Sequence, residues 1–263
     1  MQKYLTILKI TWQEGLVYRF SLFTWRLRSF LSSLTSLTVW TVIFSSNSSA
    51  FNYSKESMIT YIFLVAFLQS FIIATSLNSL ASRIYSGEIS NYLLKPLNIY
   101  WLFVTQEIAD KFRNVLFLTM ETLLLFAIFK PMVVFPNTEN FLIFLVWCFG
   151  GLIMNFIISL LFGSIGFWSP QVWGPKFLFF MIVDFTAGRL FPLDILPIFL
   201  QKIIYFTPFP YLSFLQIQLF LGKLSEQEII KHTLLLIFWI IFLGIITNNI
   251  WKKGLKTFES VGR

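Results

Sequence analysis

Apolar runs about as long as a membrane is thick recur along this chain, and they constrain its fold more than any other feature. A helix needs about 20 mostly apolar residues to cross a hydrocarbon core roughly 30 Å thick. We expect membrane spans at residues 24–46, 58–80, 112–130, 141–165, 176–191 and 232–250. Only 12% of the residues are charged, whereas soluble domains carry about 25%. The sequence therefore predicts an all-α integral membrane protein, with six transmembrane helices in a single transmembrane domain over residues 1–263.

The first twenty residues precede these runs and have a different pattern. One helical stripe is apolar and consists of Leu5, Leu8, Trp12 and Leu16. Polar side chains occupy another stripe, which is typical of a helix that lies in the membrane interface. We therefore expect residues 1–20 to form an interfacial helix that does not span the membrane.

The distribution of lysine and arginine predicts the orientation of the spans. Six spans place both termini on the same side of the membrane. If that side is the cytoplasm, it holds 14 of the 20 basic residues, and cytoplasmic loops are normally the more basic ones. We therefore expect a cytoplasmic N-terminus and a cytoplasmic C-terminus. In a membrane protein the placement of the basic residues sets the orientation of the chain. The net charge of +8 therefore does not indicate a nucleic acid as partner.

A short amphipathic pattern at residues 84–96 lies between the second and third expected spans, on the cytoplasmic side. Ser86 is a candidate N-cap, Glu88 falls in the first turn, and Pro96 ends the helix. A helix of about eight or nine residues is only about 13 Å long and cannot cross a bilayer. It can rest on the membrane or bind in a groove of a partner, and the pattern alone leaves both interpretations open.

A second unusual connection, residues 192–222, is expected on the outside. It is too apolar for a solvated loop, and Pro192, Pro197, Pro208 and Pro210 interrupt it too often for one span. Irregular backbone at membrane depth must be buried in protein or line a cavity. We therefore expect short re-entrant helices that dip into the outer leaflet before the last span.

The sequence contains no pattern that indicates catalysis. A phosphate-binding loop is missing, because Gly222 and Lys223 are followed by Leu224 and lack the upstream glycine. His232 is the only histidine, so a histidine metal site or a Ser-His catalytic pair is not expected. We predict no catalytic residue, no metal site and no enzyme activity in this chain.

Two carboxylates fall within expected spans, Glu121 in the third and Asp184 in the fifth. A buried charge in hydrocarbon costs several kcal/mol, so such residues usually face protein or a cavity. Asp184 can pair with Arg189 or extend outward. The sequence indicates no partner for Glu121. Two interpretations remain open: Glu121 has a role at a subunit interface or in the transport pathway, or it is a structural acid held by hydrogen bonds.

Taken together, the segments resemble the type-2 permeases of ATP-binding-cassette exporters, in particular the branch whose genes often occur as two different permeases beside one ATPase. The resemblance covers nearly the whole chain. It rests on four stretches in this order: YRFSLFTWRLRSFL, RIYSGEISNYLLKPLNIYW, GFWSPQVWGPKFLFF and AGRLFPLDILPIFLQKIIYFTPFPYLSFLQIQLFLGK. Each stretch is degenerate, and their order and spacing on six spans make the match specific.

The resemblance implies that residues 84–96 are a coupling helix, which sits in a groove of a cytoplasmic ATPase subunit. The positions that match this motif are Arg83, Gly87, Glu88, Ile89, Tyr92, Leu93 and Pro96. It also implies that ATP and Mg²⁺ bind to the ATPase, with no cofactor in this chain. The other implied partners are membrane lipids and a second permease subunit, identical or homologous, in a bacterial cytoplasmic membrane.

Our hypothesis is therefore the membrane-spanning permease subunit of an ATP-driven exporter, which forms the substrate pathway as a dimer. One alternative is a secondary transporter driven by an ion gradient, with Glu121 and Asp184 as coupling carboxylates. Another is a membrane enzyme that acts on lipid intermediates, although clustered His, Asp or Arg at one interface is missing. The sequence does not indicate the substrate.

Overall fold

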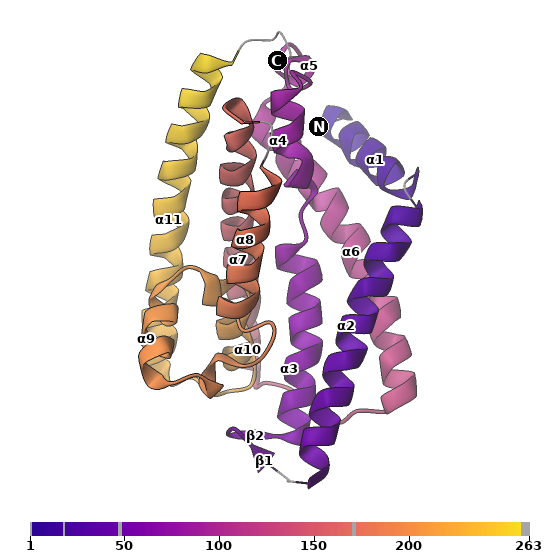
Figure 1. Cartoon of the computed structure of the whole chain (residues 1–263), viewed down its shortest axis with the longest axis vertical. Coiled ribbons are helices and arrows are strands. Elements are labelled where there is room, and N and C mark those ends of the chain that lie inside the picture. The colour runs from indigo at the N-terminus through magenta and orange to yellow at the C-terminus, as the bar shows by residue number, and fades with distance from the viewer. Residues whose placement is uncertain (1, 18, 47–48, 170–171, 259–263) are drawn as a thin grey trace.

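The computed structural model describes residues 2–17, 19–46, 49–169 and 172–258. Within these ranges the chain is almost entirely helical, so the predicted all-α fold class is confirmed. The strands found there are β1 (Ser49–Ala50) and β2 (Tyr53–Ser54), which pair antiparallel in a small hairpin. This hairpin lies at one end of an elongated helical bundle (Figure 1).

Five helical segments are long and apolar enough to cross a membrane. They are α2 (Arg19–Ser46), α3 (Lys55–Leu68) with the π-helix η1 (Gln69–Ile73), α6 (Ile99–Phe129), α7 (Thr138–Ser164) with η3 (Ile165–Phe167), and α11 (Glu226–Thr257). These segments run along the long axis of the bundle (Figure 1). They correspond to five of the six expected spans.

The expected fifth span at residues 176–191 is the exception. The helix found there, α8, covers Trp173–Thr186, 14 residues, which corresponds to a length of about 21 Å. It ends five residues early because Gly188 adopts a left-handed backbone with φ of 69°, a conformation that terminates helices. A Cβ at Gly188 would lie 2.8 Å from the Tyr61 hydroxyl, so the chain turns in a space that only glycine fits.

Polar caps set the starts of the long helices. Asn98 accepts from the backbone N–H groups of the first turn of α6, and Asn137 does so for α7. Ser225 and Glu228 form a reciprocal capping box at the start of α11. The cap at Asn98 starts α6 thirteen residues before the expected span at 112–130. The additional turns carry several charged residues, which is why hydropathy alone did not include them.

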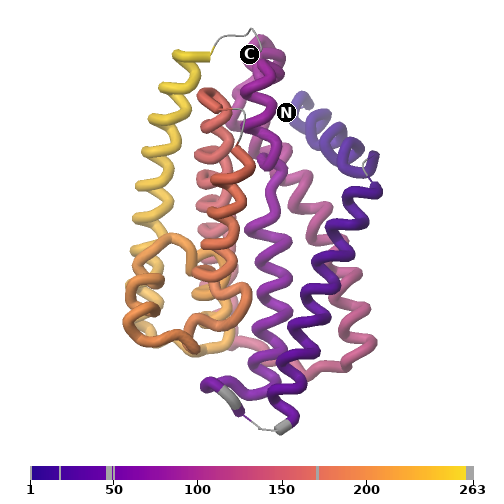
Figure 2. Tube along the Cα trace, viewed as in Figure 1, coloured from indigo at the N-terminus to yellow at the C-terminus, as the bar shows by residue number. Residues whose placement is uncertain are grey.

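The second span is broken, in contrast to the continuous helix expected at 58–80. After η1 the chain is extended at Ala74 and Thr75. It resumes as a 3-10 turn, η2 (Ser76–Ser79), and as α4 (Leu80–Tyr85). Figure 2 shows the extended link between the two helical parts. A break of this kind frees backbone carbonyl groups inside the bundle, and these need other hydrogen-bond donors.

The prediction of a single amphipathic helix at residues 84–96 is also wrong. Ser86 is the C-cap of α4, not an N-cap, and Gly87 follows with φ of 76°. A second helix, α5, covers only Ser90–Leu93. The left-handed backbone at Gly87 ends α4 and redirects the chain, so two short helices replace the one predicted. Both lie at the end of the bundle opposite to the hairpin (Figure 1).

Residues 192–222 form short helices separated by turns. These are η4 (Leu193–Ile195), α9 (Ile198–Phe206), η5 (Phe209–Leu212) and α10 (Phe214–Phe220). Every residue of α10 is buried, and α10 packs against α7. The bundle core is centred there, so this segment is an integral part of the fold.

The N-terminal helix α1 (Gln2–Val17) lies obliquely to α2 and packs against α6 (Figure 2). Trp12 of its predicted apolar stripe contacts Phe112, with 5.9 Å between the ring centroids. Leu8 is partly buried, while Leu5 and Leu16 are exposed. The stripe therefore faces the bundle in part and leaves two leucines on the surface.

Candidate functional site

A buried arginine connects three helices inside the bundle. Arg26 of α2 is only 7% exposed. Its Nη2 donates to the backbone and side-chain oxygens of Asn114 at 2.9 and 2.6 Å. Its Nη1 lies 3.4 Å from Glu121 Oε1 and 3.5 Å from Ser70 Oγ. Glu121 thus has an ion-pair partner, which lies 95 residues away in the sequence and which no local pattern indicated.

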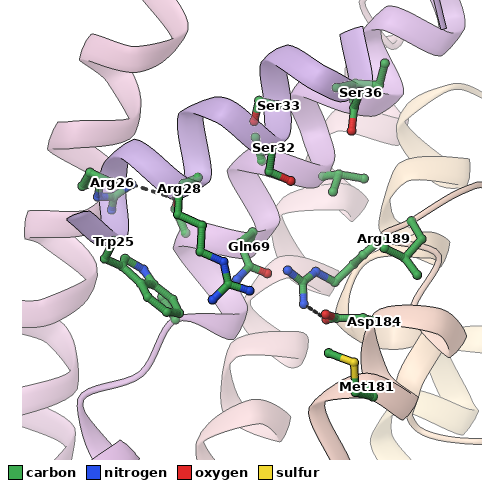
Figure 3. Close-up of a pocket in the computed structure, with 17 residues that line it drawn as sticks. Trp25, Arg26, Arg28, Ser32, Ser33, Ser36, Gln69, Met181, Asp184 and Arg189 are labelled. Carbon is green, nitrogen blue, oxygen red and sulfur yellow. Dashed lines mark hydrogen bonds and ion pairs between the residues drawn. The ribbon is translucent and has the colours of Figure 1, made fainter. Parts of the chain in front are cut away.

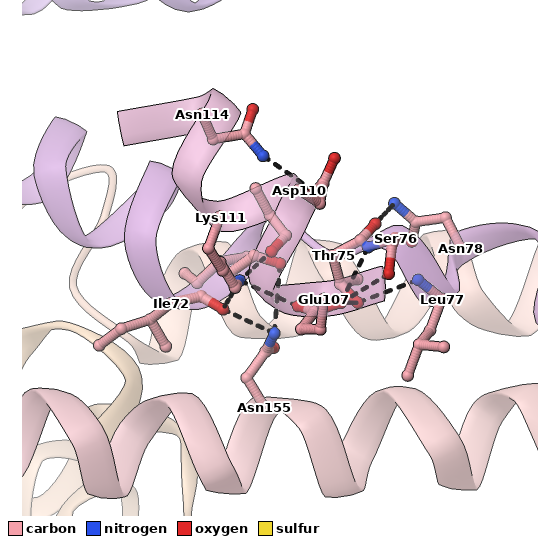
Figure 4. Close-up of polar contacts among 12 residues, drawn as sticks. Ile72, Thr75, Ser76, Leu77, Asn78, Glu107, Asp110, Lys111, Asn114 and Asn155 are labelled. Atoms are coloured by element: carbon pink, nitrogen blue, oxygen red, sulfur yellow. Dashed lines mark hydrogen bonds and ion pairs between the residues drawn. The ribbon is translucent and has the colours of Figure 1, made fainter. Parts of the chain in front are cut away.

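The break in the second span exposes two carbonyl groups that side chains from other helices satisfy. Lys111 Nζ of α6 donates to the carbonyl oxygens of Ile72, at 2.8 Å, and of Ala74. Asn155 Nδ2 of α7 donates to the same Ile72 oxygen at 2.7 Å. Figure 4 shows both donors directed at this point. The carbonyl groups that the break frees therefore remain hydrogen-bonded without water.

The other side of the break is capped by a carboxylate. Glu107 Oε2 accepts from Thr75 Oγ1 and Ser76 N at 3.0 Å each, and from Ser76 Oγ at 2.9 Å. Its Oε1 lies 3.1 Å from Lys111 Nζ. The two members of one ion pair on α6 therefore bind both sides of the break, as Figure 4 shows. Lys111 binds the carbonyl groups where η1 ends, and Glu107 binds the hydroxyl and amide groups where η2 begins. We call the pair Glu107–Lys111 the helix-break clamp.

A cavity of about 370 Å³ lies between α2, α3 and α8. Its polar lining residues are Arg26, Arg28, Ser29, Ser32, Ser33, Ser36, Gln69, Ser70, Asp184 and Arg189. Figure 3 shows the Arg28 and Arg189 guanidinium groups and the Gln69 amide directed into the same space. Asp184 forms an ion pair with Arg189, which is one of the two arrangements considered from the sequence.

A second cavity of about 400 Å³ adjoins the first on the side of α1 and α6. The two cavities share Trp25, Arg26 and Ala74 in their linings. The second is also lined by Asp110, Arg113 and Asn114. Polar side chains therefore line neighbouring spaces from the start of α2 to the middle of the bundle.

The α4–α5 segment presents only part of its predicted coupling residues to the outside. Ile89 is 1% exposed and packs into a cluster with Leu80, Ile84 and Leu102, and Gly87 is buried as well. Arg83 and Tyr92 are partly buried. The exposed residues are Ser86, Glu88, Asn91, Leu93, Leu94, Lys95 and Pro96. Leu94, which the sequence analysis did not single out, is the most exposed apolar residue among these, at 85%.

At the opposite end, a carboxylate joins the hairpin to the short helices. Asp194 Oδ2 accepts from Tyr53 Oη at 2.7 Å and from Gln218 Nε2 at 2.8 Å. Tyr205 Oη donates to Oδ1 at 3.3 Å. Burial and the nearby carboxylate raise the pKa of Tyr53, so its hydroxyl remains a hydrogen-bond donor. The network ties β2, η4, α9 and α10 together.

We predict that Tyr53→Phe lowers the free energy of unfolding by about 1–3 kcal/mol, because it leaves the half-buried Asp194 and the buried Gln218 side chains with one partner fewer. Thermal unfolding in detergent measures the change. Tyr205→Phe is the matched control, since its bond to the same carboxylate is longer and its effect should be smaller. Equal effects of the two substitutions would contradict the assignment of Tyr53 as the principal donor.

The sequence model of the family described as "ABC-2 family transporter protein" matches residues 30–262. The chain belongs to this family. The resemblance to type-2 permeases of ATP-binding-cassette transporters is thereby confirmed. No individual curated protein matches the chain. The match includes every element of this ABC-2 protein from the middle of α2 to α11, while α1, Arg26 and Arg28 precede it.

Membership of the ABC-2 family makes the chain a multi-pass membrane subunit of a transporter, not an enzyme. Within the described ranges of this ABC-2 protein, no three His, Cys, Asp or Glu side chains come close enough to hold a metal ion. The Arg26–Glu121 ion pair joins α2 to α6, and the Glu107–Lys111 pair lies within α6.

Proposed function

We propose that this chain is the permease subunit of an ATP-driven exporter, which works with a separate cytoplasmic ATPase. The observation that carries the proposal is the ABC-2 family match over residues 30–262. ATP and Mg²⁺ bind to the ATPase, because this chain has no phosphate-binding loop. A second permease subunit, identical or homologous, completes the substrate pathway.

The α4–α5 segment is the proposed contact with the ATPase. Its outer surface combines a carboxylate, Glu88, with apolar Leu93 and Leu94 and with Lys95. We name Glu88, Leu93, Leu94 and Lys95 the coupling surface. An apolar centre with charges around it is the usual composition of a protein interface. Arg83, Gly87, Ile89 and Tyr92 support this surface from behind, since they are buried or half-buried in the permease itself.

The proposed cycle follows from where these parts lie. Closure of the ATPases on ATP would push the coupling surface and move α4 relative to α6. The helix-break clamp lies between α4 and the first half of the second span. The broken span is therefore where a movement of α4 would change the access to the substrate pathway.

In this proposal the protein lies in the inner membrane of a bacterium, and the end of the bundle that holds α4 and α5 faces the cytoplasm. In this proposal α1 and the C-terminal end of α11 lie on the cytoplasmic side (Figure 1), α1 lies at the membrane interface, and residues 192–222 lie in the outer leaflet.

An ion-coupled secondary transporter receives no support from the acidic residues. Both Glu121 and Asp184 lie against an arginine, Arg26 and Arg189. The Arg26–Glu121 pair joins α2 to α6, and the Asp184–Arg189 pair joins the end of α8 to the turn that follows it, so both pairs have a structural role that needs no ion coupling. We retain the exporter subunit as the function that the molecule supports best.

Purification of the tagged chain from the membranes of its native host tests this proposal. We expect an ATPase subunit to co-purify in a ratio close to one per permease, with ATP hydrolysis in the eluate. Absence of an ATPase after gentle extraction, together with transport that collapses when the ion gradient is dissipated, would contradict the proposal.

A further inference from the structure

One arginine at the cavity between α2, α3 and α8 has no carboxylate partner within the part of the chain that the structure describes. Three arginines line it, Arg26, Arg28 and Arg189. Arg26 is paired with Glu121, and Arg189 is paired with Asp184. Among the described residues no carboxylate forms an ion pair with Arg28, whose guanidinium lies 5.5 Å from the Trp25 ring centroid. The three arginines and two carboxylates therefore leave a net charge of +1.

Two further polar atoms at this cavity lack partners. Gln69 Oε1 and Arg189 Nε are both buried, and neither makes a hydrogen bond within the part of the chain that the structure describes. Gln69 lies in the π-helix at the start of the break. Buried polar atoms are normally satisfied, so unsatisfied ones indicate a missing partner. Figure 3 shows the side chains of Arg28, Gln69 and Arg189 converging, with the Gln69 amide between the two guanidinium groups in this view.

Arg28 lies near the start of the first span. It is four residues after the expected start at residue 24, about 6 Å along a helix axis, and it is exposed on the surface of the chain as well as lining the cavity. An arginine at the edge of the hydrocarbon is unfavourable unless it meets an anion, water or a cavity. Its planar guanidinium binds carboxylate and phosphate groups with two parallel hydrogen bonds.

The rest of the lining suits a molecule with an apolar part. Ile62, Val65, Met181 and Leu190 contribute apolar surface, and Trp25 adds an aromatic ring. Ser29, Ser32, Ser33 and Ser36 place hydroxyl groups along α2 beside Arg28. The volume of about 370 Å³ is within the range of small-molecule sites. It holds a head group and the first part of a chain.

We propose that this cavity binds an amphiphile with an acidic head group, a phosphate or carboxylate attached to an apolar body. Arg28 pairs with the anion, Arg189 Nε donates to it, and Gln69 Oε1 accepts from a hydroxyl of the head group. The apolar body lies along Trp25, Val65 and Met181. Assigning this ligand class rests on the proposed transport function, because it names the kind of molecule that the permease carries.

The test is equilibrium binding to the full-length chain in phosphatidylcholine nanodiscs. The probes are radiolabelled lysophosphatidylglycerol and lysophosphatidylcholine with the same acyl chain, which differ in net charge. We expect the anionic probe to bind about tenfold tighter, which corresponds to one charge-assisted contact. Arg28→Gln should abolish this preference. The matched control Arg19→Gln, which removes an exposed arginine at the start of the same helix, should keep it.

Two further measurements make the result decisive. Ser32→Glu adds a carboxylate beside Arg28 and should weaken binding of the anionic probe more than binding of the zwitterionic probe. This second variant tests the same charge if Arg28→Gln lowers expression. Inorganic phosphate at equal concentration should not displace the lysolipid, and displacement would contradict the need for an apolar body. Equal binding of both probes to the unaltered chain would overturn the proposal. No ATPase takes part in this assay, so that result would leave the proposed exporter function untouched.

Discussion

Replacing Lys111 by methionine should lower the free energy of unfolding by about 3–5 kcal/mol, the range found when one partner of a buried ion pair is removed. Lys111 Nζ contacts Glu107 and the carbonyl oxygens of Ile72 and Ala74. Methionine has a similar volume and donates no hydrogen bond. The substitution would leave a buried carboxylate without its cation and two carbonyl groups with fewer donors. Chemical or thermal unfolding in detergent measures the loss.

Lys253→Met is the control for this experiment, because Lys253 is exposed and the same change there should alter stability by about 0.5 kcal/mol or less. Combining Lys111→Met with Glu107→Gln should recover part of the loss, since the carboxylate is then neutral. A double-mutant cycle gives the coupling between the two side chains. Equal stability of Lys111→Met and Lys253→Met would show that the helix-break clamp does not hold the second span.

The clamp also shows where sequence-based prediction reached its limit in this protein. Residues 58–80 are apolar enough to be predicted as one span, and the chain indeed follows a helical path through most of them. The break at Ala74 and Thr75 is stable because Glu107, Lys111 and Asn155 supply hydrogen bonds from 31 to 83 residues away. A hydropathy pattern contains no information about such partners, so the break could not be predicted.

The 14 basic residues that favour a cytoplasmic N-terminus include Arg26 and Arg28, which lie near the start of a span. In the structure Arg26 is buried among α2, α3 and α6, and Arg28 lines the cavity beside it. Counting charges near span ends treats every arginine as solvated, whereas Arg26 belongs to the polar interior. The count carries no information about such a role.

The local signals at the α4–α5 segment were identified correctly as unusual, but their meaning was not. A serine followed by an acid two residues later suggested an N-cap at Ser86. Gly87 decided the outcome instead, because its left-handed backbone ends α4 there. The exposure of each side chain identifies which residues of the segment are available to a partner.

The coupling surface leads to the second large expected effect. Leu94→Asp should reduce co-purification of the ATPase by about tenfold or more, because it would bury a carboxylate without a partner among apolar contacts, and a loss of about 1.4 kcal/mol in binding free energy is already tenfold. Glu88→Lys should act in the same direction by reversing a charge at the edge. Quantitative immunoblotting of the ATPase retained on the tagged permease measures both.

Phe135→Asp provides the matched control, since Phe135 is 79% exposed and lies in the loop before α7, at the hairpin end of the bundle (Figure 1). It adds the same charge in place of an exposed apolar residue and should leave ATPase retention unchanged. Ile89→Ala is unsuitable as a test of contact, because Ile89 is buried and a cavity there would destabilise the segment by about 2–5 kcal/mol. If Leu94→Asp and Glu88→Lys retain the ATPase as well as Phe135→Asp does, the ATPase binds elsewhere on the permease, and the family's coupling position does not apply to α4 and α5.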